Sequence, residues 1–169
     1  ADLYDLAESA NRRAVRGMIA ETARRVPVGS HMLECAAGTG EISLAAAPFA
    51  RCVLCTDLSL PMLERARRKA VRRGLSNIAF AQRDLFQLPD QDGSFGAVCA
   101  ANVLHLLDAP EKAVAELWRV TAPGGVLLLP TFLMGEAGPV MRVLIALYRL
   151  LGFRQKHMFT RRSYRAFLE

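Results

Sequence analysis

The stretch HMLECAAGTGEISLAA, residues 31–46, begins as an apolar run, passes one acid and then loses almost all of its side chains. Glu34 stands near the end of the apolar run, and five small residues, 36–40, come before an alanine-rich segment. Small residues let the backbone turn sharply and let another molecule approach it closely. The pattern predicts a strand over 31–36, a tight turn, and a helix over 40–48.

Short apolar runs alternate with longer amphipathic segments along the rest of the chain. This pattern predicts further strands over 51–56, 77–82, 95–103 and 126–132, and helices over 3–25, 60–73, 109–121, 139–151 and 160–168. Strands that alternate with helices indicate a parallel sheet with right-handed crossovers, and continuous apolar strands fit a sheet buried on both faces. The expected fold class is therefore α/β: a doubly wound, Rossmann-like, mainly parallel sheet with helices on both faces.

Length and composition bound the kind of protein. The chain has 169 residues, of which 52% are hydrophobic and 22% charged, which is typical of one soluble globular domain. No apolar run approaches the ~18 residues of a membrane span. The charged N-terminal segment does not resemble a signal peptide. These features predict a cytoplasmic location without stable membrane insertion.

The four cysteines, at positions 35, 52, 55 and 99, lie in apolar stretches. This placement predicts reduced, buried thiols rather than a disulfide framework. Cys52 and Cys55 have the spacing of a metal or redox pair, but on one strand they would point to opposite faces. No metal site is therefore expected.

The net charge of +6 raises the question of a nucleic-acid partner. The densest basic run, 64–74, has its apolar positions on one stripe of a predicted helix, so its arginines form the solvated face. No aromatic residue interleaves with the run, which weakens a single-strand-binding interpretation. Nucleic acid is accordingly the less favoured partner.

Two classes of ligand compete for the turn at 36–40. A dinucleotide fingerprint, G-x-G-x-x-G, needs a third glycine where Glu41 stands, and an acid there repels a diphosphate. Glu34 adds to that repulsion and suits a ligand with a cationic amino group. The signs of these charges favour S-adenosylmethionine, which carries an ammonium, a sulfonium and no phosphate.

Acids also close the next two predicted strands. Asp57 ends the second, about 20 residues after the turn, where an acid can bond ribose hydroxyls. Asp84 follows the third and can accept from an adenine amino group. Because parallel strands end at one edge of the sheet, Glu34, Asp57 and Asp84 are expected to form one constellation.

The chain resembles the class I S-adenosylmethionine-dependent methyltransferases, in particular the type 11 group that includes ubiquinone/menaquinone-biosynthesis C-methyltransferases. The resemblance covers about residues 28–133 and rests on MLECAAGTGEISL, VLCTDLSLPMLERARRKA, IAFAQRDLFQLPDQDGSFGAVCAANVLHLLD and ELWRVTAPGGVLLLPTF. The resemblance implies two further strands, six and seven, for which the sequence predicts no counterpart after residue 132.

The resemblance implies S-adenosylmethionine as the cofactor and assigns a role to each part of the site. It implies that Asp57 holds the ribose, that residues at the ends of strands two and three flank the adenine, and that Asn102 faces the methionine moiety. The implied cofactor-binding residues are Glu34, Ala36, Ala37, Gly38, Gly40, Asp57, Leu58, Met62, Asp84, Leu85 and Asn102.

The predicted function is transfer of a methyl group to a small acceptor, within a single domain, 1–169. Its parts are an N-terminal helix or lid (1–26), the cofactor-binding core (28–133) and a helical segment on the substrate side (134–169). The apolar content of this last segment suggests an apolar acceptor, although core packing explains it equally well. His105 is either a general base or a structural histidine, so no catalytic residue is assigned.

Several alternatives stay open at this point. They are a nucleotide (NAD)-dependent oxidoreductase on a similar fold, an RNA methyltransferase that uses the arginines, and a binding protein of methyltransferase ancestry without catalysis. The segment AANV after the fourth strand lacks the Asn-Pro-Pro-Tyr-like tetrapeptide expected for methylation of nucleic-acid amines. The sequence leaves open the acceptor atom and the oligomeric state.

Overall fold

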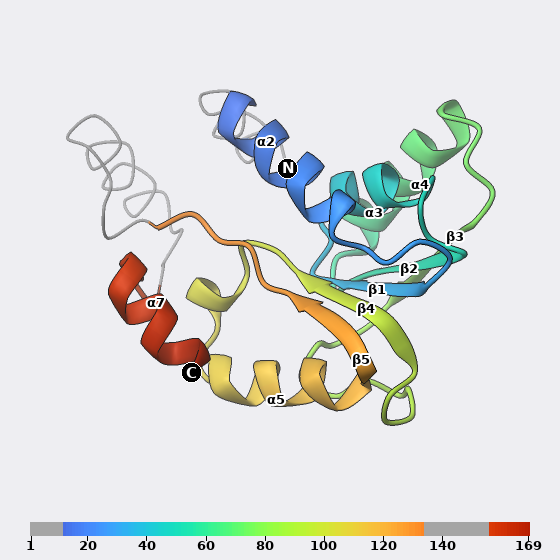
Figure 1. Cartoon of the computed structure of the whole chain (residues 1–169). Coiled ribbons are helices and arrows are strands. Elements are labelled where there is room, and N and C mark those ends of the chain that lie inside the picture. The colour runs from blue at the N-terminus through green and yellow to red at the C-terminus, as the bar shows by residue number, and fades with distance from the viewer. Residues whose placement is uncertain (1–11, 134–155) are drawn as a thin grey trace.

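The structure is a computed structural model that describes residues 12–133 and 156–169. Five strands pair in parallel in the order β3-β2-β1-β4-β5, which confirms the predicted α/β fold class (Figure 1). Their bounds are β1 (His31–Cys35), β2 (Cys52–Asp57), β3 (Ile78–Gln82), β4 (Phe95–Ala100) and β5 (Thr121–Leu128).

Helices cover both faces of this sheet (Figure 1). One face carries α2 (Arg12–Arg24), α3 (Glu41–Ala46) and α4 (Leu60–Arg72). The other carries the short 3-10 helix η1 (Leu104–Leu106), α5 (Pro110–Val120) and α7 (Arg161–Leu168). The core therefore lies in two layers, one on each side of the central strands.

Alternation along β1 shows how the sequence builds both layers. Met32 packs with the cluster beneath α2 and α3, whereas Leu33 and Cys35 pack with the cluster beneath α5. All three side chains are almost fully buried. Successive strand residues point to opposite faces, so an uninterrupted apolar run is what a doubly covered parallel strand requires.

Two strands differ in extent from the prediction. β4 ends at Ala100 rather than at residue 103, because Asn102 adopts a left-handed conformation with φ of 51°. β5 begins at Thr121, directly after α5, rather than at residue 126. Thr121 pairs with Phe95, and the register then shifts before Val126 pairs with Ala97. The predicted helix over 139–151 and the first part of the predicted helix over 3–25 lie outside the described residues.

Three of the four thiols are buried, as predicted, but Cys52 is exposed. It is the first residue of β2, where the strand emerges from the core, and Cys55 points to the opposite, buried side. Within the described ranges, no group of three or more His, Cys, Asp or Glu side chains is placed to hold a metal. In the same part of the chain, no helix is long and apolar enough to cross a membrane.

Candidate functional site

The site lies where the strand order reverses, between β1 and β4. In open α/β sheets, ligands bind outside the carboxyl ends of the strands at this point. Ala36 follows β1 and Asn102 follows β4, and both have φ of 51°, a left-handed conformation that is rare for residues other than glycine. The two residues with left-handed backbone therefore follow the carboxyl ends of two neighbouring strands, at the same edge of the sheet.

Three backbone N–H groups of the turn at 36–40 donate hydrogen bonds to acceptors within the protein. The N–H of Ala37 donates to the carbonyl of Thr56 at 2.9 Å, and the N–H of Gly40 donates to the carbonyl of Ala37 at 2.8 Å. The N–H of Gly38 donates to Oδ2 of Asp57 at 2.7 Å. A diphosphate at a glycine turn needs such donors free, and these three already have partners.

The two glycines of the turn, Gly38 and Gly40, differ in the space around their α-carbons. A Cβ at Gly40, where φ is 74°, would lie 2.8 Å from the Cβ of Ala66, so only glycine lets α4 pack here. A Cβ at Gly38, where φ is 54°, would meet nothing within 4 Å. The space beside Gly38 is therefore open, and a ligand such as an adenosyl group has room to approach the backbone there.

Glu34 lies beneath the turn rather than along an open surface. Its residue is 2% exposed, and its Oε2 accepts a hydrogen bond of 2.7 Å from the N–H of Ser43. Burial raises the pKa of Glu34 to about 7, although the hydrogen bonds from Ser43 oppose this rise. The carboxyl group is thus close to half charged near neutral pH.

Asp57 is half-buried at the end of β2 and reaches the turn directly. Besides the bond from Gly38, its Oδ1 accepts a hydrogen bond of 2.8 Å from the N–H of Ser59. Ser59 is the N-cap of α4, and a proline lies at the start of the helix, but the Ser59 side chain makes no capping bond. One carboxylate therefore orders both the glycine turn and the start of α4.

The residues expected beside an adenine differ in exposure. Leu58 is 60% exposed, and Met62 is half-buried on the first turn of α4. Asp84 is exposed two residues after β3, and its Oδ1 accepts from the N–H of Phe86 at 2.9 Å. Leu85 is buried in the core on the α5 side, unlike the exposed side chains of Leu58 and Asp84.

Asn102 ties three elements together at the end of β4. Its N–H donates to the carbonyl of Pro130, and its Oδ1 accepts from the N–H of Phe132, both at 2.9 Å. Its Nδ2 lies 3.6 Å from the sulfur of Met18 on α2. Sequence reasoning named Asn102 but missed Met18, because the contact joins segments 84 residues apart.

His105 lies in η1, just beyond β4, and is buried. Among the residues that the structure describes, its Nδ1 has no hydrogen-bond partner, and burial lowers the pKa of its ring, which favours the neutral imidazole. Its carbonyl accepts from the N–H groups of Lys156 and His157, the residues that lead toward α7. The histidine is thus held by its backbone, with a ring nitrogen left unbonded.

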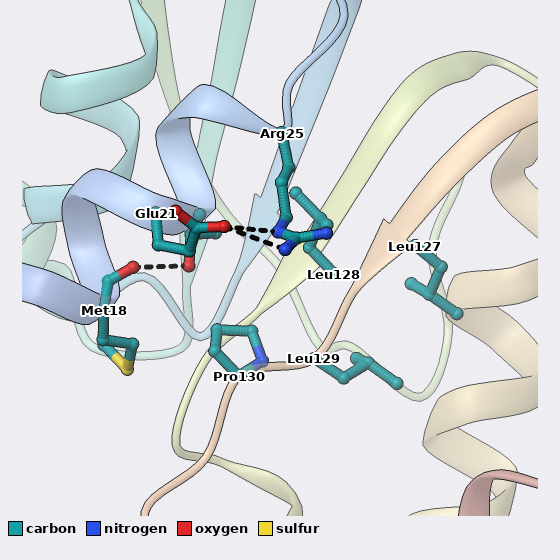
Figure 2. A pocket seen from close by; sticks show the side chains of 8 residues that line it. Met18, Glu21, Arg25, Leu127, Leu128, Leu129 and Pro130 are labelled. Atoms are coloured by element: carbon teal, nitrogen blue, oxygen red, sulfur yellow. Dashed lines mark hydrogen bonds and ion pairs between the residues drawn. The ribbon is translucent and has the colours of Figure 1, made fainter.

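A cavity of about 270 Å³ lies between α2 and β5 (Figure 2). Its apolar walls come from Met18 and from the end of β5 and the residues after it, and Figure 2 shows an ion pair between Glu21 and Arg25 at its rim. The cavity is not at the glycine turn, but Met18 and Pro130 line it and also contact Asn102. It therefore adjoins the β4 side of the site. Its lining residues are Met18, Glu21, Thr22, Arg25, Leu127, Leu128, Leu129 and Pro130.

Comparison with known proteins assigns the class. Residues 33–129, more than half of the chain, match the methyltransferase domain family, and the chain belongs to that family. Among curated relatives, it is 41% identical over 138 residues to a demethylmenaquinone methyltransferase of Thermus thermophilus, an alignment that covers 78% of this chain and 59% of that protein. The chain thus spans about six-tenths of the length of such relatives.

Solved structures agree with the fold. The YcgJ protein from Bacillus subtilis superposes with a TM-score of 0.72 at 26% identity, covering 89% of this chain and 64% of that one. The [4+2]-cyclase SpnF superposes with a TM-score of 0.63 at 29% identity, covering 69% and 44%. The same architecture therefore serves a protein that is named for a different reaction.

Proposed function

We propose that this chain binds S-adenosylmethionine and transfers its methyl group to a small quinone-type acceptor. The observation that carries the proposal is the chemistry of the turn at 36–40. Three of its N–H groups, those of Ala37, Gly38 and Gly40, bond to the protein's own carbonyls and to Asp57, and Glu34 lies buried beneath it. Such a site favours a cation over a diphosphate.

Each residue of the site would contact a different part of the cofactor. Asp57 would accept hydrogen bonds from the ribose hydroxyls while keeping its bond to Gly38. The exposed side chains of Leu58 and Asp84 would border the adenine, with Met62 behind them. The methionine moiety would lie along Ala36, Ala37 and Asn102, where the strand order reverses between β1 and β4. Glu34, buried beneath the turn, would attract the ammonium group of this moiety by its negative charge.

When bound, S-adenosylmethionine supplies a methyl group on a positively charged sulfur, which needs no further activation. The chain's task is then to align the acceptor with that carbon and to exclude water. A carbon acceptor must lose a proton after the new carbon–carbon bond has formed and the carbon–sulfur bond has broken. The neutral ring of His105 is the candidate to accept that proton.

Two observations support a quinone-type acceptor. The Thermus relative is named for demethylmenaquinone. The cavity beside Asn102 has walls of methionine, leucine and proline, which suit an apolar molecule.

An NAD-dependent oxidoreductase is disfavoured by the occupied donors of the turn. An RNA acceptor is disfavoured because the basic run on α4 is partly engaged within the protein. Lys69 and Arg73 form ion pairs with Glu41, and Arg67 lies 5.4 Å from the centre of the Phe80 ring. An adenosyl-binding protein without methyl transfer is the second candidate, since the similar [4+2]-cyclase shows that the fold alone does not specify the reaction.

The experiment is a transfer assay with S-adenosylmethionine labelled in its methyl group. The acceptors are a demethylmenaquinol with a short isoprenoid tail, the matching quinone and total RNA, with the Asp57→Ala variant as the control. We expect label in the quinol product and an equal amount of S-adenosylhomocysteine. Label in RNA alone would overturn the acceptor, and S-adenosylhomocysteine binding without transfer to any acceptor would favour the second candidate.

A further inference from the structure

Glu34 is enclosed by three particular neighbours. Its register partners are Cys55 on β2 and Cys99 on β4, so both thiols lie on the same face of the sheet beside the carboxyl group. Ser43 of α3 covers it and is fully buried. Burial raises the pKa of the Cys55 thiol to about 12, and it also raises the pKa of the Cys99 thiol well above its ordinary value. Both thiols are therefore uncharged at neutral pH.

The charged groups that act on Glu34 are both acidic. They are Asp57 at the end of β2 and Glu41 at the start of α3, and both disfavour a second negative charge. Burial disfavours that charge more strongly still. A carboxylate in this place needs donors that favour its charged form.

Ser43 donates two hydrogen bonds to the carboxyl group of Glu34. Its N–H lies 2.7 Å from Oε2 of Glu34, and its hydroxyl donates to the same oxygen. These two bonds are the interactions that lower the pKa of Glu34. Within the described part of the chain, both hydrogen bonds to this carboxyl group end on one oxygen, so the serine also fixes the orientation of the group.

We propose that Ser43 is a positioning residue for cofactor binding: it favours the carboxylate form of Glu34 beneath the glycine turn, where that charge attracts the ammonium group of the cofactor. The inference rests on the proposed function and extends it to a residue that touches no ligand. A merely structural serine would fill space and satisfy a helix end, and its loss would weaken all adenosyl ligands equally at every pH.

The test compares two ligands by calorimetric titration between pH 6 and pH 9. S-adenosylhomocysteine carries the ammonium group, whereas 5′-methylthioadenosine has the adenosine and sulfur but no ammonium. The proteins are the wild type, Ser43→Ala, Glu34→Gln and the double variant. Cys99→Ala is the matched control, because it removes a buried neighbour of Glu34 without removing a hydrogen bond to it.

We expect the wild type to bind S-adenosylhomocysteine more tightly as pH rises through about 7. Loss of one hydrogen bond to a charged group moves that midpoint up by about one pH unit, so Ser43→Ala should bind about five-fold more weakly at pH 7 and nearly normally at pH 9. In Glu34→Gln the pH dependence should vanish, and adding Ser43→Ala should then change nothing. Binding of 5′-methylthioadenosine and the midpoint of Cys99→Ala should stay as in the wild type.

A carboxyl-carbon NMR titration of Glu34 gives the same midpoint without ligand, and Ser43→Cys, which keeps the volume, replaces Ser43→Ala if the latter does not fold. An unchanged midpoint in the serine variant, or an equal loss for both ligands at every pH, would overturn the inference. Failure of the wild type to bind either ligand would instead refute the proposed function.

Discussion

The carboxylate of Asp57 and the backbone N–H of Gly38 are joined by a hydrogen bond of 2.7 Å. This bond links the end of β2 to the turn after β1, although the two residues lie 19 positions apart. It places a negative charge where a dinucleotide-binding turn would present free donors. The bond disfavours a diphosphate at this turn, and it is the geometric basis of the proposed adenosyl site.

Replacement of Asp57 should weaken cofactor binding strongly. Asp57→Ala removes the proposed acceptor for two ribose hydroxyls, and loss of two hydrogen bonds to a charged group corresponds to about 100-fold in the Kd of S-adenosylhomocysteine. Asp57→Asn keeps an acceptor oxygen without the charge and should lose about ten-fold. Calorimetry measures both, and equal affinities of the wild type and Asp57→Ala would place the ribose elsewhere.

Alanine substitutions at Gly40 and Gly38 should distinguish the role of Gly40 in packing from the role of Gly38 in ligand access. Gly40→Ala should lower the free energy of unfolding by about 3 kcal/mol, because the new methyl group collides with Ala66 and φ is left-handed. Gly38→Ala should cost about 1 kcal/mol, from the left-handed φ alone. Urea unfolding gives both values.

Ligand binding by Gly38→Ala is the complementary measurement. Its methyl group would project into the open space beside the turn, so S-adenosylhomocysteine should bind at least several-fold more weakly despite a nearly normal fold. An unchanged Kd in this variant would show that the ligand does not approach Gly38.

Glu34 should make stability depend on pH. Its pKa is raised from 4.5 to about 7 in the folded protein, so between these values the folded state keeps a proton that the unfolded state releases. The contribution of Glu34 to stability is therefore greatest below pH 4.5 and falls by about 3 kcal/mol as pH rises to above 7.

Glu34→Gln is the control for this titration. It keeps an oxygen for the bonds from Ser43 but has no proton to lose, so the variant should be more stable than the wild type at pH 8 while binding S-adenosylhomocysteine less well. Urea unfolding at pH 5 and pH 8 measures the difference. If the two proteins show the same change in stability between these pH values, Glu34 does not titrate as described.

The sequence predicts the features that depend on neighbouring residues, but not those that depend on contacts between segments far apart in the chain. The strands, the helices and the turn at 36–40 follow from local periodicity, and parallel strands necessarily bring Glu34 and Asp57 to one edge. The depth of Glu34 did not follow, because it depends on Ser43 closing over the carboxyl group from the next helix. Periodicity identifies the face of a strand but not what covers that face.

Other differences have the same origin. Cys52 is exposed because β2 begins outside the core, which an apolar neighbourhood in the sequence does not reveal. β5 begins five residues early because Thr121 pairs with Phe95 across an irregular register. The helix period could have pointed to Ser43, which lies three positions after Gly40 on the first turn of α3.

The hydroxyl of Tyr164 should hold α7 in place. It donates to the carbonyl of Leu129 at 2.6 Å, and burial raises its pKa to about 12, so it stays a donor at neutral pH. Tyr164→Phe keeps the ring beside the rings of Phe159 and Phe167 and should cost about 1 kcal/mol of folding stability. Hydrogen exchange should show faster exchange in α7 with α5 unchanged, and unchanged exchange in α7 would mean that ring packing alone holds the helix.

The most direct test of the central claim is calorimetric titration of the wild-type protein with S-adenosylhomocysteine and, separately, with NADH at pH 8. The acids around the turn predict micromolar binding of S-adenosylhomocysteine and no measurable binding of NADH. Tight binding of NADH, with a diphosphate held at the turn of Gly38 and Gly40, would contradict the account.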